Sequence, residues 1–259
     1  MKKLLILLVS LVIFIFGGCQ SLASGGQGDI ADKPAVNLPV TPEEDDSIER
    51  KKTYILINAS SLRVRSGAGT NYTAIGSVEK NDMLSYQGQK GSYYITTYKE
   101  KQAFVHKDYC TLVEFELSSD KIENAIEFGT KLLGYPYVWG SQRYHWGNGK
   151  LNTNFVNGEF DCSAFVQYIY YKTNGVLLDV TSRAQSLEGK LVEKSDLKRG
   201  DLMFFTNASR KDKVGIEKVG HVGIYFGNNY ILHTASDYAV IEPISSTRWS
   251  YYLHSRRVV

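Results

Sequence analysis

The sequence predicts a small all-β barrel over residues 53–114, followed by an α+β domain over residues 115–259. Between Tyr54 and Val113, short β-rich pieces alternate with turn signals, and about sixty residues of this kind suit a small barrel. From residue 118 the pattern changes, because apolar residues first recur at helical spacing and strand-like runs follow. Helices that precede antiparallel strands are typical of an α+β domain.

The barrel is predicted from four apolar or β-branched pieces and the turns between them. The pieces are residues 54–57, 62–65, 93–96 and 103–105. Signals that contain Gly, Asn or Asp separate these pieces at residues 66–69, 80–82 and 89–91. This alternation predicts short strands joined by tight turns.

Two helices and three strands are predicted in the second domain. Ser119 with Glu123 resembles an N-terminal cap, and apolar residues then keep helical spacing up to Gly134. A second helix is predicted over residues 161–174, with Gly175 as its C-terminal cap. The predicted strands cover residues 202–205, 219–226 and 230–235.

The first 52 residues are predicted to be a targeting segment and a tether. Residues 1–18 have the basic start, the apolar run and the small residues of a secretory signal. The apolar run is shorter than the roughly 20 residues that a membrane-spanning helix needs. Its end resembles a bacterial lipoprotein box, which implies lipidation of Cys19. Residues 19–52 are low in aromatics and contain a Ser/Gly-rich stretch, which is typical of a flexible tether.

We therefore expect an exported protein, held at the periplasmic or extracellular face of the cell envelope by a lipid on Cys19. A plain signal peptide or a retained anchor is the alternative. The formal net charge is +3, and it falls to +1 without Lys2 and Lys3 of the signal segment. Because nucleic-acid-binding domains carry a marked basic patch, we expect no nucleic-acid partner. We also expect a monomer.

Cys162, at the predicted start of a helix, is the candidate nucleophile. A free thiol has a pKa of about 8.5, and lowering it by about 5 units needs roughly 7 kcal/mol. A helix N-terminus contributes at most about 2 kcal/mol. A nearby imidazolium must therefore supply most of the stabilisation of a thiolate.

Two of the five histidines, His221 and His233, are placed to act with this thiol. They flank a strong turn signal at residues 227–229 in strand-like sequence. A hairpin centred near Gly227 pairs residues whose numbers add to 454, which puts the two histidines directly opposite each other on one face. One imidazole can then act as a base that the other orients. The alternative is two unrelated, half-buried histidines.

Four motifs in this order resemble those of the NlpC-type cell-wall cysteine peptidases. They are PYVWG (136–140), DCSAF (161–165), GDLMFF (200–205) and HVGIY (221–225), with His233 after them. The resemblance covers essentially all of residues 118–259. It implies a papain-like α+β fold that hydrolyses peptidoglycan stem peptides, commonly between D-γ-glutamate and a diamino acid. Residues 62–72 and 104–109 resemble the bacterial SH3 domain, which implies an SH3-like barrel. Such a barrel either recognises the cell wall or shapes one side of the active site.

The resemblance implies that Cys162 is the nucleophile, that His221 is the base and that His233 orients His221. Tyr137 lies beside the thiol in this family, and it is expected to bind the oxyanion. The backbone N–H of Cys162 is the expected second donor to that oxyanion.

Four further residues are candidates for substrate contact. Asp161 and Ser163 match positions that contact the substrate, and Asp161 has the alternative role of capping the helix. Trp139 is expected either to line the cleft or to lie in the core. Ser182 is a candidate cleft residue.

No metal or cofactor is expected, since the chain has no Cys-x-x-Cys or His-Glu-x-x-His spacing. Two segments are longer than the family pattern. Residues 141–160 are predicted to form one wall of the cleft, and the charged residues 207–218 are interpreted as a solvated loop. The rival hypotheses are an N-acetylmuramoyl-L-alanine amidase or a crosslink-cleaving peptidase on the same fold, and a wall-binding lipoprotein whose peptidase domain is idle.

Overall fold

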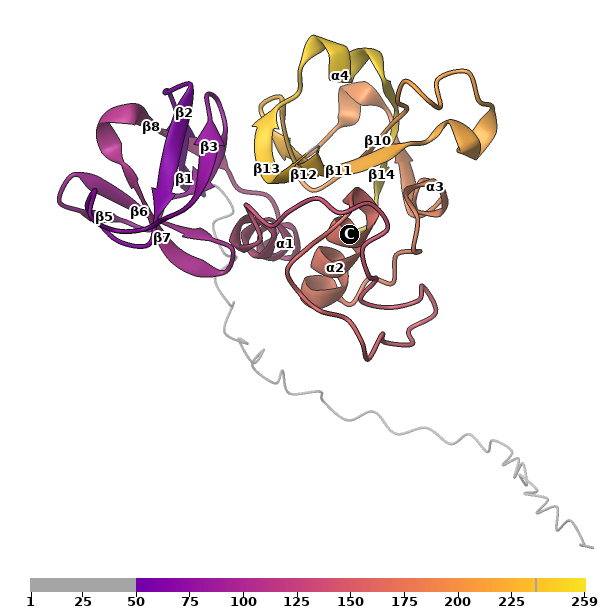
Figure 1. Ribbon diagram of the computed structural model, residues 1–259. Coiled ribbons are helices and arrows are strands. Elements are labelled where there is room, and N and C mark those ends of the chain that lie inside the picture. The colour runs from indigo at the N-terminus through magenta and orange to yellow at the C-terminus, as the bar shows by residue number, and fades with distance from the viewer. Residues whose placement is uncertain (1–49, 236) are drawn as a thin grey trace, which may run out of the picture. The chain divides into compact units, whose positions relative to one another are not determined.

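A computed structural model describes residues 50–235 and 237–259 of the chain (Figure 1). All of them belong to one compact unit, Asp46–Val259. The predicted signal segment 1–18, the lipidation site Cys19 and the tether up to residue 49 lie outside the described residues. Within the described ranges, none of the helices combines the length and the apolar character needed to span a bilayer.

The first part of the described chain is built of short antiparallel strands in two sheets. The strands are β1 (Lys51–Ile57), β2 (Ser61–Arg65), β3 (Ala74–Glu79), β4 (Met83–Ser85), β5 (Gln89–Lys90), β6 (Tyr93–Tyr98), β7 (Lys101–His106) and β8 (Cys110–Glu116). One sheet has the order β4-β1-β8 and the other the order β3-β2-β7-β6-β5. All four pieces predicted as strands lie within observed strands. The assignment of this β region to the bacterial SH3 type stays a prediction.

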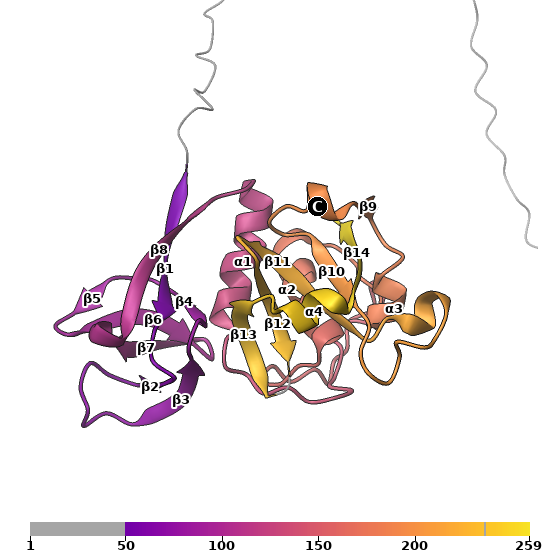
Figure 2. The same ribbon diagram turned by 90° about the horizontal axis from the view of Figure 1, so that it is seen from above.

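The second part of the described chain combines helices with a six-stranded antiparallel sheet of order β13-β12-β11-β10-β14-β9. The helices are α1 (Asp120–Lys131), α2 (Cys162–Asn174), α3 (Ser182–Gln185) and α4 (Ser246–Ser250). The strands are β9 (Lys190–Val192), β10 (Leu202–Phe205), β11 (His221–Gly227), β12 (Tyr230–Ala235), β13 (Tyr238–Pro243) and β14 (Tyr252–Arg257). Helices α1 and α2 pack against each other, and α2 packs on β11 and β12 (Figure 2). The predicted mixture of helices and strands is confirmed in this part.

Helix α2 begins at Cys162 because the side chain of Asp161 caps it. Oδ1 of Asp161 accepts a hydrogen bond from the backbone N–H of Ala164 at 2.9 Å. At the other end, Gly175 has a φ of 68°, a left-handed conformation that glycine adopts without strain. Residues 162–170 are buried without a break, so the helix is fixed on all sides. Its N-terminus therefore holds Cys162 in a defined place.

The hairpin β11–β12 has a different register from the predicted one. Asn228 and Asn229 have φ values of 48° and 65°, which fit a two-residue turn with both central residues left-handed. The ladder pairs Ile224 with Leu232 and Tyr225 with Ile231, so the numbers of these pairs add to 456. An irregularity between Tyr225 and Gly227 then pairs Gly227 with Tyr230 next to the turn. The predicted centre at Gly227 is therefore wrong by one residue, since the two asparagines form the turn.

The corrected register makes His221 and His233 diagonal neighbours rather than direct partners. Its continuation places Gly223 opposite His233. A Cβ on Gly223 would lie 2.9 Å from Cβ of His233, which is too close for any side chain. The even shift of two residues keeps both histidines on one face of the sheet. Gly223 thus makes room for His233.

Arg199 joins the β region to the second part of the chain. Its guanidinium donates to Glu123 at 2.8 and 3.0 Å, to the hydroxyl of Tyr54 at 2.7 Å and to the carbonyl of Phe226. The side chains of Arg199 and Glu123 are only 7% and 14% exposed. Removal of one partner of such a pair leaves an uncompensated buried charge.

We expect Arg199→Met to lower the free energy of unfolding by about 3 kcal/mol, because the Glu123 carboxylate loses its partner. Chemical unfolding followed by tryptophan fluorescence measures this loss. The matched control is Lys52→Met, because the ion pair of Lys52 with Glu127 (3.1 Å) is 30% and 53% exposed. That variant should lose less than about 1 kcal/mol. Equal losses in the two variants would contradict a structural role for the buried pair.

Candidate active site

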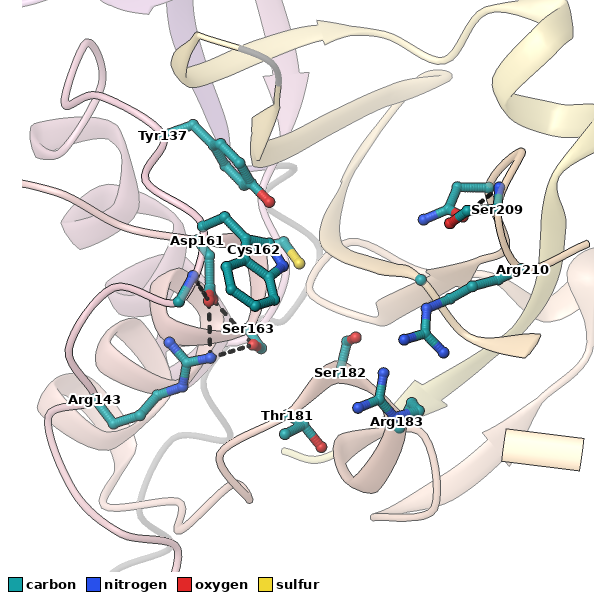
Figure 3. Close-up of a pocket in the computed structure, with 14 residues that line it drawn as sticks. Tyr137, Arg143, Asp161, Cys162, Ser163, Thr181, Ser182, Arg183, Ser209 and Arg210 are labelled. Carbon is teal, nitrogen blue, oxygen red and sulfur yellow. Dashed lines mark hydrogen bonds and ion pairs between the residues drawn. The ribbon is translucent and has the colours of Figure 1, made fainter. Parts of the chain in front are cut away.

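Cys162 and His221 line two adjoining pockets. Cys162 lines a cavity of about 350 Å³, and His221 lines a second cavity of about 410 Å³. Tyr137, Asn207 and Gly220 line both, so the two cavities share a wall. Figure 3 shows the first cavity, with the Cys162 thiol directed into its opening.

The thiol of Cys162 is held in its neutral form by burial. Burial raises its pKa to about 11, and the carboxylate of Asp161 acts in the same direction. Hydrogen bonds from the backbone N–H groups of Val222 and Ser163 act the other way. The contact with Val222 places the thiol beside the start of β11, next to His221. The thiolate–imidazolium pair expected from the sequence is therefore not favoured here, because burial penalises both charges.

A chain of hydrogen bonds runs from His221 to β13. Nε2 of His221 lies 2.8 Å from Nδ1 of His233, and Nε2 of His233 lies 2.9 Å from Oε1 of Glu242. Nη2 of Arg248, in α4, donates to the same carboxylate oxygen at 2.9 Å. The contact between the two imidazoles is present although the residues are not directly opposed.

The carboxylate of Glu242 sets the direction of this chain. Burial acts to raise the pKa of Glu242. The hydrogen bond with His233 and the charge of Arg248 lower this pKa by more than burial raises it, so the carboxyl group is ionised. A carboxylate only accepts hydrogen bonds, so His233 donates from Nε2. Burial lowers the pKa of His233, although Glu242 opposes this shift, and the ring is neutral near pH 7. Its Nδ1 is therefore an acceptor.

His221 consequently donates from Nε2 to His233 and keeps Nδ1 as a free acceptor. Burial, with the charges of His233 and Arg248, lowers the pKa of His221 well below its usual value. The imidazole is thus neutral at pH 7, with its basic nitrogen available. This is the protonation state that a general base needs.

Asp161 and Ser163 meet Arg143 at one side of the first cavity (Figure 3). Oδ2 of Asp161 accepts from Nη2 of Arg143 at 2.8 Å and from the backbone N–H of Gly140 at 3.2 Å. The hydroxyl of Ser163 donates to Oδ1 of Asp161 at 3.0 Å and accepts from Arg143 at 3.1 Å. Asp161 thus caps α2 and also lines the cavity, so its two expected roles coexist.

Tyr137, Trp139 and Ser182 also line the first cavity. Burial, together with the charges of Cys162 and Asp161, raises the pKa of Tyr137, so its hydroxyl is a hydrogen-bond donor at neutral pH. Trp139 is 85% exposed, so the alternative that placed it in the core is wrong. Ser182 is the first residue of α3. The functional role of each of the three stays a prediction.

The two long segments contribute to the site in ways that were not expected, although most of residues 207–218 are exposed as predicted. Of residues 141–160, Arg143 alone lines the cavity, while Tyr144 and Phe155 pack on Tyr168 of α2 with ring centroids 5.1 Å apart. The prediction of a cleft wall is wrong for most of this segment, because its aromatic residues cover α2. Three members of the presumed solvated loop 207–218 line the cavity instead; they are Asn207, Ser209 and Arg210.

Sequence reasoning missed Arg143, Glu242 and Arg248, which complete the polar contacts of the site. None of them belongs to a motif, and their partners in the site lie 6 to 20 residues away along the chain. Only Glu242 could have been suggested by the sequence, because a carboxylate in a strand next to the strand of a histidine is a suitable partner for a buried imidazole. Within the described ranges, no group of three His, Cys, Asp or Glu side chains is arranged to hold a metal ion.

Comparisons with known proteins identify a family for the second part of the chain. Residues 134–258 match the model of the NlpC/P60 family. The peptidoglycan DL-endopeptidase CwlO of Bacillus licheniformis is 34% identical over 147 residues, which cover 55% of this chain and 29% of that protein. A gamma-D-glutamyl-L-lysine dipeptidyl-peptidase of Bacillus subtilis is 32% identical over 130 residues, which cover 50% of this chain and 37% of that protein.

Among solved structures, an NlpC/P60 family protein from Bacillus cereus matches 80% of this chain and 63% of its own, with 22% identity and a TM-score of 0.41. The chain spans less than two thirds of the length of each of these three proteins.

Proposed function

We propose that the NlpC/P60 domain at residues 134–258 is a cysteine peptidase that hydrolyses peptidoglycan stem peptides. The observation that carries the proposal is the chain His221–His233–Glu242, which leaves Nδ1 of His221 free as a base. His221 directly precedes Val222, whose backbone N–H contacts the buried thiol of Cys162. Two relatives whose names specify peptidoglycan or γ-D-glutamyl peptide cleavage support the substrate class.

In the proposed reaction, Nδ1 of His221 takes the thiol proton as Sγ of Cys162 attacks the scissile carbonyl. The backbone N–H of Cys162 and the hydroxyl of Tyr137 stabilise the oxyanion. His221 then protonates the leaving amine, which leaves a thioester on Cys162. Water hydrolyses the thioester with His221 again as the base. Because the thiol is neutral at rest, proton transfer accompanies attack and does not precede it.

The proposed scissile bond joins D-γ-glutamate to the diamino acid of the stem peptide. Support for this bond is the name of the Bacillus subtilis relative, a gamma-D-glutamyl-L-lysine dipeptidyl-peptidase. We further propose a papain-like fold for the domain and an SH3-like fold for the strands β1–β8. In the described part of the chain, neither cavity is lined by a residue of these strands, which favours wall recognition over shaping of the site as their role.

We also propose export and lipid anchoring on Cys19, on the strength of the basic, apolar and small residues that precede it. The anchored protein would act as a monomer on stem peptides near the membrane. Globomycin-sensitive processing and a palmitate label lost in Cys19→Ser test this part independently of the enzymatic activity.

Digestion of purified muropeptides tests the proposed activity. Wild-type protein should release fragments that end in D-glutamate, whereas Cys162→Ala should release none, because it lacks the nucleophile. Mass spectrometry of the products identifies the bond that is cut. Fragments that retain the whole stem peptide without its sugar would instead indicate an amidase. Loss of activity on addition of a chelator would argue against the thiol mechanism.

A further inference from the structure

Two arginines line the first cavity across from the Asp161–Arg143 pair. Arg183 comes from α3 and Arg210 from the segment 207–218. Figure 3 shows both guanidinium groups directed toward the opening of the cavity, on the other side of the Cys162 thiol from Arg143. Neither residue has a part in the reaction proposed above.

The charges around these two arginines do not balance. Arg143 is paired with Asp161, the only carboxylate among the described residues that line the cavity. Arg183 and Arg210 share a single carboxylate, Glu217, at 3.4 and 3.1 Å. Two cations therefore face one anion, and the side chain of Glu217 is 60% exposed and lies outside the cavity lining. The cavity keeps an excess positive charge next to the thiol.

Glu217 also holds the two guanidinium groups in place. Nη1 of Arg210 donates to the backbone carbonyl of Glu217 at 2.8 Å and to its carboxylate at 3.1 Å. Arg183 meets the other carboxylate oxygen through Nε. Within residues 50–235 and 237–259, no hydrogen bond engages either Nη of Arg183 or Nη2 of Arg210. These planar donors are thus positioned but unoccupied, and their geometry matches a carboxylate.

We propose that Arg183 and Arg210 form a carboxylate-binding subsite, which selects stem peptides with a free carboxylate next to the scissile bond. This inference rests on the proposed function and specifies its substrate class. Two carboxylates of a stem peptide have the required chemistry: the α-carboxylate of D-glutamate, and the second carboxylate of diaminopimelate, which lysine lacks. Amidation of the first, or lysine in place of diaminopimelate, removes the charge that the subsite binds.

Binding to the inactive variant Cys162→Ala tests the subsite without any need for cleavage. Four stem peptides are compared by calorimetry, with D-glutamate free or amidated and with diaminopimelate or lysine. One of the two carboxylates should tighten binding by about 10- to 100-fold relative to its neutral counterpart, as expected for hydrogen bonds to a charged group. The identity of that carboxylate distinguishes the two sources. Equal dissociation constants for all four peptides would overturn the subsite.

Arginine variants assign the preference to these side chains. Arg183→Gln and Arg210→Gln, each combined with Cys162→Ala, should lose the preference but bind the neutral peptide as before. Lys211→Gln is the matched control, since Lys211 lies in the same segment and does not line the cavity. A preference that survives in both arginine variants would overturn the proposal. Peptides that bind the Cys162→Ala protein with the predicted preference but resist cleavage by wild type would refute the proposed function alone.

Discussion

Replacement of His221 by alanine is expected to lower kcat/KM at pH 7 by about 10⁴-fold. With the pKa of Cys162 raised to about 11, only about one thiol in 10⁴ is ionised at pH 7 without a base. Wild-type enzyme avoids this limit, because neutral His221 removes the proton during attack. The variant must rely on the small thiolate fraction.

The pH profile separates this explanation from a general loss of structure. The thiolate fraction rises tenfold with each pH unit below the thiol pKa, so kcat/KM of His221→Ala should rise about 100-fold between pH 7 and pH 9. Wild type should stay nearly constant over this range, since burial keeps His221 neutral well below pH 6.5. A flat profile for the variant, or a loss below about tenfold, is incompatible with a neutral resting thiol.

Glu242→Met should lower kcat by about 100-fold or more, with little change in KM. Methionine offers Nε2 of His233 no acceptor, whereas a glutamine could keep its carbonyl oxygen at the place of Oε1, which accepts from both His233 and Arg248. Without the acceptor, the His233 proton is no longer held on Nε2 and can move to Nδ1. That proton then faces the Nε2–H of His221, and relief of the clash moves the His221 proton onto its basic nitrogen. The same tautomer error in a serine protease, an Asp to Asn change at the orienting carboxylate, costs about 10⁴-fold.

Arg248→Met is the matched control for this variant. It removes the other partner of the Glu242 carboxylate but leaves that carboxylate to accept from His233. We expect kcat of this control to fall by less than about tenfold. The ratio of the kcat values of the two variants then measures the effect of the tautomer. Unchanged kcat in Glu242→Met would show that the orientation of His233 does not depend on the carboxylate.

The helix at Cys162 could be predicted because its signals are local. The Asp161 cap, the apolar residues and Gly175 lie within one stretch of chain, and each has its expected place in α2. The two strands of the hairpin could also be predicted from the sequence. The register of the hairpin could not be predicted, because Gly227, Asn228 and Asn229 are all suitable turn residues and the sequence does not show which two of them form the turn.

The partners of the site could not be predicted, because they meet through tertiary packing. Glu242 reaches His233 across the β12–β13 pair, and β13 is not among the strands predicted from the sequence. Arg143 reaches Asp161 from a segment with no periodic pattern. The thiol pKa was misjudged for a related reason, since burial depends on the whole fold while the helix dipole depends on one element.

Cleavage of a defined stem peptide in the presence of hydroxylamine tests the thioester on Cys162 most directly. Hydroxylamine competes with water for a thioester, so wild type should form the γ-hydroxamate of D-glutamate in a share that grows with hydroxylamine concentration. Cys162→Ala should form neither hydroxamate nor free acid. If every hydroxylamine concentration gave only the product in which D-glutamate has a free γ-carboxylic acid, an acyl-enzyme on Cys162 would be contradicted.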